Sequence, residues 1–255
     1  TLLGGKGDDT LWGDGGNDRL DGGLGVDHVS GGDGDDIITD AGNDIGAGDV
    51  LHGDAGNDVI NGGNGLDLIF GGEGQDFIYG GTEAKDVTAG FGNDFVSGPV
   101  DGSVLKGNEG DDWIEGGVGA GGLDSLAGDN SELFFNSTII GRDGDNDYDA
   151  ESGDDIMVQG AGIERNNGMA GFDWAIHKGA TKGVEADLGI PLFVNQQANI
   201  LRDRFDLVEG LSGSDFGDVL TGRETVIGVT TKPPVQPRSL TWPARLSSLM
   251  PTHSP

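Results

Sequence analysis

The chain has 255 residues, which is enough for one or two domains, but 52 are glycine, only 6% are aromatic, and the formal net charge is −31. So few aromatic and so many acidic side chains exclude an ordinary globular core. They also exclude a nucleic-acid partner, because nothing here would neutralise phosphates. We expect neither a transmembrane segment nor a signal peptide, because no apolar stretch is long enough.

The first predicted element, residues 4–39, is a nonapeptide repeated four times with the pattern G-G-x-G-x-D-x-U-x, where U is aliphatic. Its copies read GGKGDDTLW, GDGGNDRLD, GGLGVDHVS and GGDGDDIIT. A four-residue insertion at 40–43 resets the frame, and we expect it to form a bulge or loop at a turn. A second run occupies 44–124 and is clearest in GDAGNDVIN, GGNGLDLIF and GGEGQDFIY. Repetition at a fixed short period predicts a solenoid.

The eighth position of the repeat is aliphatic in every copy. It holds Leu11, Leu20, Val29, Ile38, Leu51, Ile60, Ile69, Ile78, Val87, Val96, Leu105, Ile114 and Leu123. One apolar side chain between two unconstrained positions is what a three-residue strand needs when only its middle side chain faces a core. The preceding glycines permit a sharp turn with positive φ. Each copy therefore predicts a turn and a short strand, and the copies must stack because none can bury its apolar side chain alone.

The sixth position carries the chemistry. It holds Asp9, Asp18, Asp27, Asp36, Asp49, Asp58, Asp67, Asp76, Asp94 and Asp112, with Lys85, Ser103 and Gly121 as departures. A carboxylate at the end of a glycine turn, beside backbone carbonyls, offers the hard oxygen ligands that Ca²⁺ takes in groups of about six to eight. The chain has no cysteine and only four scattered histidines, so softer metals are not favoured. These aspartates are the candidate Ca²⁺ ligands.

This pattern resembles the haemolysin-type calcium-binding β-roll of RTX (repeats-in-toxin) proteins. The resemblance implies an all-β fold, a right-handed parallel β-roll or solenoid with two nonapeptides per coil and Ca²⁺ between turns eighteen residues apart. Thirteen repeats then make between six and seven coils, roughly 30 Å long at the usual strand spacing. On these residues, the resemblance pairs Asp9 with Asp27, Asp18 with Asp36, Asp49 with Asp67, Asp58 with Asp76, Asp76 with Asp94, and Asp94 with Asp112.

The three departures fall on every second repeat, and in such a roll they all lie on one edge. We therefore predict ions along one edge to its end and few on the other edge beyond Asp67. Lys85 is expected to substitute in part for an ion, with its ammonium next to Asp86.

The next predicted element, residues 125–149, is an irregular insertion that is both acidic and apolar. Its apolar patch is expected to cover the end of the roll or to add a strand, and it comprises Leu133, Phe134, Phe135, Ile139 and Ile140. Residues 143–154 imitate an EF-hand loop, but Tyr148 replaces the required glycine and Asp154 the usual glutamate. An EF-hand, an irregular Ca²⁺ site and a solvated acidic loop are the three interpretations.

Residues 150–222 are predicted to form a degenerate, β-rich extension. Three units at 150–176 carry Asp155, Glu164 and Asp173 at position six, and a last unit at 213–221 carries Asp218. Asp155, Asp173 and Asp218 complete the candidate metal ligands. Asn166 stands at position eight, where it does not suit an interior.

Other conspicuous side chains have structural interpretations. Trp113, Phe172 and Trp174 are expected to pack rather than to bind a ligand. His177 is expected at the surface or in packing, because no acid or nucleophile stands at a recognisable spacing from it.

Residues 223–255 form the last predicted element, a disordered or extended tail. No acidic residue occurs from Thr225 onward, and six of the eight prolines lie there. RTX proteins exported in one step carry an uncleaved C-terminal signal, so the resemblance implies the type I secretion machinery as a partner. A truncation or reading-frame artefact is the other interpretation. Residues 111–222 also resemble the repeat region of large bacterial exoproteins called rhizobiocins or carrying an animal-type haem peroxidase domain.

No catalytic motif is recognisable, so we predict no active site within these residues. The predicted function is calcium binding, in a module that folds with Ca²⁺ in a secreted, extracellular bacterial protein of the toxin or bacteriocin type. Two alternatives stand beside it. The chain is the C-terminal part of an RTX peroxidase, protease or lipase whose catalytic domain lies upstream, or it is a spacer or adhesin array that Ca²⁺ stiffens.

Overall fold

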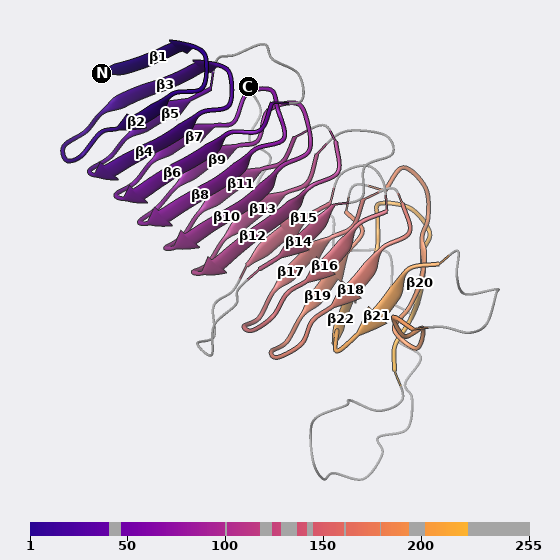
Figure 1. Ribbon diagram of the computed structural model, residues 1–255. Coiled ribbons are helices and arrows are strands. Elements are labelled where there is room, and N and C mark those ends of the chain that lie inside the picture. Colours follow the sequence, from indigo (N-terminus) through magenta and orange to yellow (C-terminus); the bar gives the residue numbers. More distant parts are fainter. Residues whose placement is uncertain are drawn as a thin grey trace, which may run out of the picture. The chain divides into compact units, whose positions relative to one another are not determined.

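The computed structural model describes residues 1–40, 47–99, 101–117, 124–128, 137–141, 145–160, 162–178, 180–193 and 202–223. Residues 1–223 form one compact unit. The described residues form strands and no helix (Figure 1), and in particular no helix of theirs has the length and apolarity needed to cross a membrane.

Most strands belong to two long parallel sheets. In the described part of the chain the eleven-stranded sheet has the order β1 (Leu2–Lys6), β3 (Arg19–Leu24), β5 (Ile37–Thr39), β7 (Val59–Asn61), β9 (Phe77–Tyr79), β11 (Phe95–Ser97), β13 (Trp113–Glu115), β15 (Thr138–Ile140), β17 (Ile156–Val158), β19 (Trp174–Ile176) and β22 (Gly210–Ser212). The ten-stranded sheet has the order β2 (Thr10–Trp12), β4 (His28–Asp33), β6 (Val50–Ala55), β8 (Leu68–Glu73), β10 (Asp86–Phe91), β12 (Val104–Glu109), β14 (Ser125–Ala127), β16 (Asp147–Asp149), β18 (Arg165–Asn167) and β21 (Arg204–Asp206).

From β1 to β19, strands that follow one another in sequence alternate between these two sheets, so each coil gives one strand to each sheet (Figure 1). Leu11 is in register with Val29, and Val29 with Leu51. The second step is four residues longer, and this is the length of the predicted insertion at 40–43. Residues 41–46 lie outside the described part, but the strands on either side keep their register. The parallel β-roll expected from the RTX resemblance is confirmed.

The interior consists of the eighth-position side chains. They are at most 6% exposed from Leu11 to Ile114. Because the register sets each of them beside its counterpart one coil away, the core is a stack of single aliphatic residues. This stack is the burial that a lone repeat cannot achieve.

The predicted frame fails after Ile114. Leu123 and Gly121 lie outside the described residues, and the residue in register with Leu105 is Leu126, which is fully buried. Asp124 therefore stands at position six. The sequence favoured Leu123 because it continued the nine-residue count, but three additional residues displace the strand.

The roll continues through residues 125–149, which were expected to be an irregular insertion. Strands β14, β15 and β16 come from this segment and extend both sheets. Ile139 and Tyr148 are fully buried at position eight. Because Tyr148 is the middle residue of a strand in the core, an EF-hand loop is not formed there. The patch residues Leu133, Phe134 and Phe135 lie outside the described residues.

In the extension, Met157, Ala175 and Phe205 occupy the interior as the register predicts. Asn166 is fully buried as well, contrary to expectation. Its Oδ1 accepts a hydrogen bond of 2.8 Å from Gln159 Nε2, and its Nδ2 donates one of 3.4 Å to the Arg204 carbonyl. A buried amide is tolerated in this position because both of its polar atoms have partners.

The last predicted unit does not join the two long sheets. Strand β23 (Val219–Thr221) pairs with β20 (Glu185–Asp187) in a separate sheet of two strands within the described residues. Leu220 is 41% exposed, so it is not an interior residue.

Trp113, Phe172 and Trp174, the aromatic residues expected to pack, lie outside the core. Trp113 and Trp174 occupy position seven and are 43% and 41% exposed, because neighbours of the eighth position point outward. Phe172 is 48% exposed, and its ring centroid lies 5.8 Å from that of Trp174. His177 is buried, with Nδ1 3.1 Å from the Ser212 carbonyl oxygen and Nε2 3.5 Å from Asp203 Oδ2, an acidic neighbour that spacing along the chain did not indicate.

Candidate metal centre

Tight glycine turns present the sixth-position carboxylates. In the first complete repeat, Gly5 and Gly7 both have φ near +101°, a region that a side chain rarely permits. Where position two is not glycine, Asp14 and Asp54 adopt φ values of 67° and 74°. Asp and Asn tolerate this conformation better than other side chains, so the turn is kept where the glycine pattern breaks.

The turns form two rows, which we call edges. The first edge comprises the turns that lead into the eleven-stranded sheet, and it carries Asp18, Asp36, Asp58, Asp76, Asp94 and Asp112. The second edge comprises the turns that lead into the ten-stranded sheet, and it begins with Asp9, Asp27, Asp49 and Asp67.

Along each edge the aspartates form a hydrogen-bonded ladder. The backbone N–H of each one donates to Oδ1 of the aspartate in the next coil. On the first edge the distances run from 2.7 to 2.9 Å between Asp18 and Asp112. On the second edge they run from 2.6 to 3.0 Å between Asp9 and Asp67. The six aspartate pairs implied by the RTX resemblance are therefore neighbours in adjacent coils.

The other carboxylate oxygen has a different environment. Oδ2 of Asp36, Asp58, Asp76, Asp94 and Asp173 is buried and receives no hydrogen bond from the described residues. These five residues are at most 3% exposed. A buried, unsatisfied carboxylate oxygen is costly, so its presence in a repeated element indicates a cation partner.

The first glycine of the repeat is required by the same geometry. A Cβ added at Gly53 would collide with Oδ2 of Asp58 and with the Gly71 carbonyl oxygen of the next coil. At Gly22 the added Cβ would stand 2.6 Å from Oδ2 of Asp27. A carboxylate oxygen and a backbone carbonyl thus converge between coils at a place that only glycine leaves open.

Burial changes the acidity of these carboxyl groups. Removal from water raises the pKa of Asp58 and of Asp173 to about 7, and of Asp76 and Asp94 to about 6, although the ladder hydrogen bonds oppose the rise. Near neutral pH the ladder therefore holds carboxylates whose charge is poorly solvated. A divalent cation between the coils would offset that cost.

The donor set fits Ca²⁺. Paired carboxylates and inter-coil carbonyls are hard oxygen ligands, which Ca²⁺ prefers. In the described part of the chain no three His, Cys, Asp or Glu side chains gather closely enough to hold a metal on their own. Because each coil supplies one carboxylate per edge, backbone carbonyls must supply the other ligands.

The second edge departs from the aspartate ladder at Lys85 and Ser103. The N–H of Lys85 donates to Ser103 Oγ at 2.9 Å, and the N–H of Ser103 donates to Asp124 Oδ1 at 2.9 Å. Asp124 is 2% exposed and stands where Gly121 was expected, so the third predicted departure is wrong.

The first edge has a departure of its own, which the sequence did not reveal. Ser137 stands one coil beyond Asp112 and accepts from its N–H at 3.4 Å. Asp155 and Asp173 then resume the ladder at 3.0 Å, as candidate ligands in adjacent coils. Lys85 and Ser103 do lie on one edge, and the ladder of Asp58, Asp76, Asp94 and Asp112 is unbroken on the other, as predicted. Beyond Asp112 both edges have a departure, Ser137 on the first edge and Asn146 on the second.

Three further acidic residues occupy ladder positions that sequence reasoning missed or did not include. Glu164 accepts from the N–H of Asn146 at 2.8 Å, and its own N–H donates to Asp203 Oδ1 at 3.0 Å. Glu209 accepts from the N–H of Asp173 at 3.1 Å. Burial raises the pKa of Glu164 to about 8. For Asp203 and Glu209 the usable signal was an apolar residue two positions later, Phe205 and Leu211, whereas Glu164 is followed there by Asn166.

Asp218 differs from the other candidates. Its Oδ1 accepts hydrogen bonds from the N–H of Val184 at 2.9 Å and from Ser214 Oγ at 2.7 Å, and its Oδ2 accepts from the N–H of Ser214 at 2.9 Å. This carboxylate has protein donors on both oxygens and lies beside the two-stranded sheet. The structure does not bring it into either edge.

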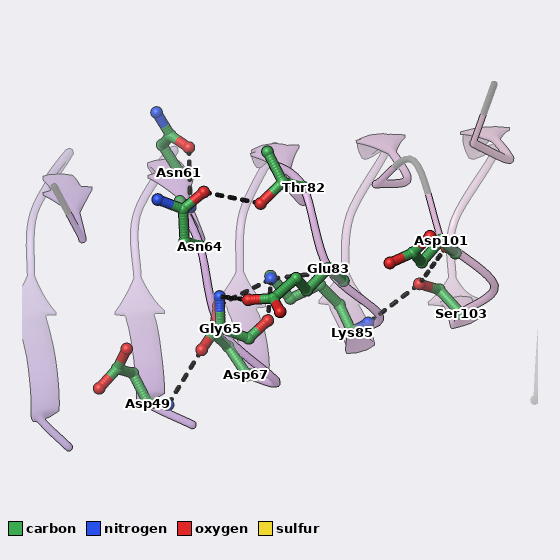
Figure 2. A network of polar contacts seen from close by, with 11 residues as sticks. Asp49, Asn61, Asn64, Gly65, Asp67, Thr82, Glu83, Lys85, Asp101 and Ser103 are labelled. Atoms are coloured by element: carbon green, nitrogen blue, oxygen red, sulfur yellow. Dashed lines mark hydrogen bonds and ion pairs between the residues drawn. The ribbon is translucent and has the colours of Figure 1, made fainter. Parts of the chain in front are cut away.

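Lys85 contacts Asp67, not Asp86 as predicted. Its Nζ lies 3.1 Å from Asp67 Oδ2, and both side chains are fully buried (Figure 2). Asp86 is exposed at position seven and points away from the turn. The alternation of a strand places adjacent residues on opposite faces, so a sequence neighbour was the wrong partner.

Comparison with protein families gives one match. The model described as RTX calcium-binding nonapeptide repeat (4 copies) matches residues 1–29, 46–78, 70–98, 100–131 and 134–157, more than half of the chain. Neither the curated proteins nor the solved structures gave a significant match. A parallel β-roll, two ladders of buried carboxylates and this match agree with one another. The chain belongs to the family of RTX calcium-binding nonapeptide-repeat proteins.

Proposed function

We propose that residues 1–223 are a calcium-dependent folding and stabilising module of an exported bacterial protein. The observation that supports this most is the row of buried Oδ2 atoms without a protein donor, from Asp36 to Asp94 on the first edge. Folding buries these charges, and bound Ca²⁺ would supply the positive charge that the chain lacks.

Calcium-dependent folding would serve export of the chain. With a net charge of −31, the chain repels itself when cations are scarce, and it stays extended enough to be threaded by a type I secretion machinery. Outside the cell, Ca²⁺ sites in extracellular modules have dissociation constants of about 10⁻⁴ to 10⁻³ M. At ten times its dissociation constant one site adds about 1.4 kcal/mol to stability, so several sites together exceed the stability of a small domain.

The module has a supporting role in its parent protein. In the described part of the chain the interior is mainly a stack of single side chains, whereas tuning an acid and a base apart takes an apolar pocket, so we propose no active site among these residues. Catalysis, where the parent protein has it, would belong to another domain.

The test is circular dichroism during a Ca²⁺ titration that starts in chelator. We expect little β-structure in chelator and a steep gain at millimolar Ca²⁺. Titration with NaCl at matched ionic strength is the control, because simple screening of the negative charge would also favour compaction. A chain that is fully folded in chelator, or that folds equally in NaCl, would contradict the proposal.

A further inference from the structure

Between the coil of Asp67 and the coil of Lys85, the chain supplies a cation of its own. The side chain of Lys85 is fully buried, and its Nζ contacts three oxygens (Figure 2). These are Asp67 Oδ2 at 3.1 Å, the Glu83 carbonyl at 3.1 Å and the Gly65 carbonyl. A lysine ammonium has three N–H donors and no acceptor, so all of its donors are used here.

The three oxygens come from equivalent places in successive coils. Gly65 and Glu83 are both fourth residues of their repeats, one coil apart, and Asp67 is the sixth-position carboxylate of the first of these coils. Two backbone carbonyls and one carboxylate thus converge on a point between the coils. This is the kind of oxygen set that a hard cation takes elsewhere on the ladder.

The lysine stem also enters the space that the glycine keeps open. A Cβ added at Gly62 would stand 2.7 Å from Cδ1 of Ile69, and 3.1 Å from both the Gly80 carbonyl oxygen and Cε of Lys85. In the repeats that begin at Gly22 and Gly53, the nearest side-chain atom to such a Cβ is instead Oδ2 of the repeat's own aspartate. Lys85 therefore reaches back one coil and places its charge beside Asp67.

We propose that the Lys85 ammonium permanently replaces a Ca²⁺ ion between the coils of Asp67 and Lys85. The ion pair therefore stabilises the contact between these two coils at any calcium concentration. The proposal rests on the function proposed above, since it concerns one position of the same ladder.

Neighbouring contacts reinforce the same step. The N–H of Gly65 donates to Glu83 Oε2 at 2.8 Å, and Thr82 Oγ1 donates to Asn64 Oδ1 at 2.7 Å (Figure 2). Both hydrogen bonds join the two coils that the ammonium joins. Folding of a solenoid can start at any repeat and spread to its neighbours, so a step that needs no metal is a site from which the roll can grow.

The first experiment counts Ca²⁺ ions bound per chain by equilibrium dialysis and elemental analysis. Lys85→Asp restores the repeat pattern and should bind one ion more than the natural sequence, whereas Lys85→Met should bind no more. Lys106→Asp is the matched control, because it makes the same change of charge at an exposed position and should add no ion. Equal ion counts for Lys85→Asp and the natural sequence overturn the proposal. A natural sequence that binds no Ca²⁺ contradicts the proposed function instead.

A second experiment uses the natural sequence, in case the variants do not fold. The N–H of Asp86 donates to the Asp67 carbonyl at 3.0 Å, and the N–H of Phe95 donates to the Asp76 carbonyl at 2.9 Å. In chelator, hydrogen exchange of Asp86 should stay slower than that of Phe95 by tenfold or more. Equal exchange rates at the two amides would show that Lys85 does not stabilise the contact between its two coils, and this result overturns the proposal.

Discussion

At the scale of single residues, the sixth-position aspartate performs two roles with its two oxygens. Oδ1 accepts the N–H of the preceding coil and fixes the side chain, as in Asp76, which accepts from Asp58. Oδ2 is directed into the space between coils beside a carbonyl oxygen. The hydrogen bond orients the carboxylate, and orientation is what a shared cation site requires.

Proton binding should compete with Ca²⁺ at these residues. Burial raises the pKa values of Asp58 to about 7 and of Asp76 and Asp94 to about 6. Because these carboxyl groups bind protons more tightly in the folded chain, their protonation stabilises the metal-free fold. This stabilisation is complete below the unfolded-state pKa of about 3.9 and is lost as pH rises through the folded-state values to about 7. In chelator, acidification from pH 8 to pH 4 should therefore increase β-structure by circular dichroism. A metal-free chain whose β-structure falls on acidification would refute this linkage.

Removal of one ladder charge should weaken calcium-driven folding. Asp76→Asn keeps an oxygen for the Asp58 N–H but removes the charge, so it should cost about 1–3 kcal/mol in the presence of Ca²⁺ and raise the Ca²⁺ midpoint. Asp86→Asn makes the same change at an exposed residue and serves as the control. Calcium titrations followed by circular dichroism provide the measurement, and superimposable curves for the two variants would speak against the assignment of Asp76.

The buried ion pair should behave differently from a calcium site. Lys85→Met leaves the Asp67 carboxylate buried without its cation, and loss of one partner of a buried pair costs about 3–5 kcal/mol. Urea unfolding in Ca²⁺ should show this loss, because methionine does not restore a metal ligand. Lys106→Met, at an exposed lysine, should leave stability within about 0.5 kcal/mol.

At the scale of the turn-and-strand unit, the first glycine and the eighth residue have different structural roles. The glycine leaves room for convergent oxygens, and the aliphatic side chain joins the interior stack. Gly53→Ala should destabilise the roll by about 1–3 kcal/mol, because its Cβ meets Asp58 Oδ2 and the Gly71 carbonyl. Gly217→Ala is the control, since a Cβ there meets nothing within 4 Å. Urea unfolding in Ca²⁺ measures the stability of both variants. Equal stability would show that the space between the coils at Gly53 tolerates a methyl group.

At the scale of the whole compact unit, cohesion comes from repetition and not from a deep core. From β1 to β22, each described strand of the two long sheets pairs in parallel with the strand of the next coil. Its interior provides little apolar surface per coil, so the sum of many metal-linked steps decides whether the chain folds.

Size in solution should report this dependence. A disordered chain of this length has a radius of gyration of about 55 Å. Small-angle X-ray scattering should approach that value in chelator and fall well below it at millimolar Ca²⁺. The same compact value in both conditions would mean that the aliphatic stack alone is sufficient.

Sequence reasoning was reliable where the nonapeptide count is unbroken. From Leu11 to Ile114 the period indicated which residues are buried. The RTX resemblance, with two nonapeptides per coil, implied which carboxylates are neighbours and how the strands pair. The count fails where three residues intervene, so Leu126 and Asp124 took the places expected for Leu123 and Gly121.

The sequence by itself determined a solenoid of turns and short strands and its interior stack, because these are local consequences of a period of nine. Its resemblance to RTX repeats implied the β-roll and the partners of most of its aspartates. Only the tertiary structure decided that Asn166 is buried with its amide satisfied, that Ser137 interrupts the first edge and that Asp218 stands apart. It also decided that the Lys85 ammonium pairs with the Asp67 carboxylate in the preceding coil. The direction of a long side chain depends on which oxygens surround it in space, and spacing along the chain does not contain that information.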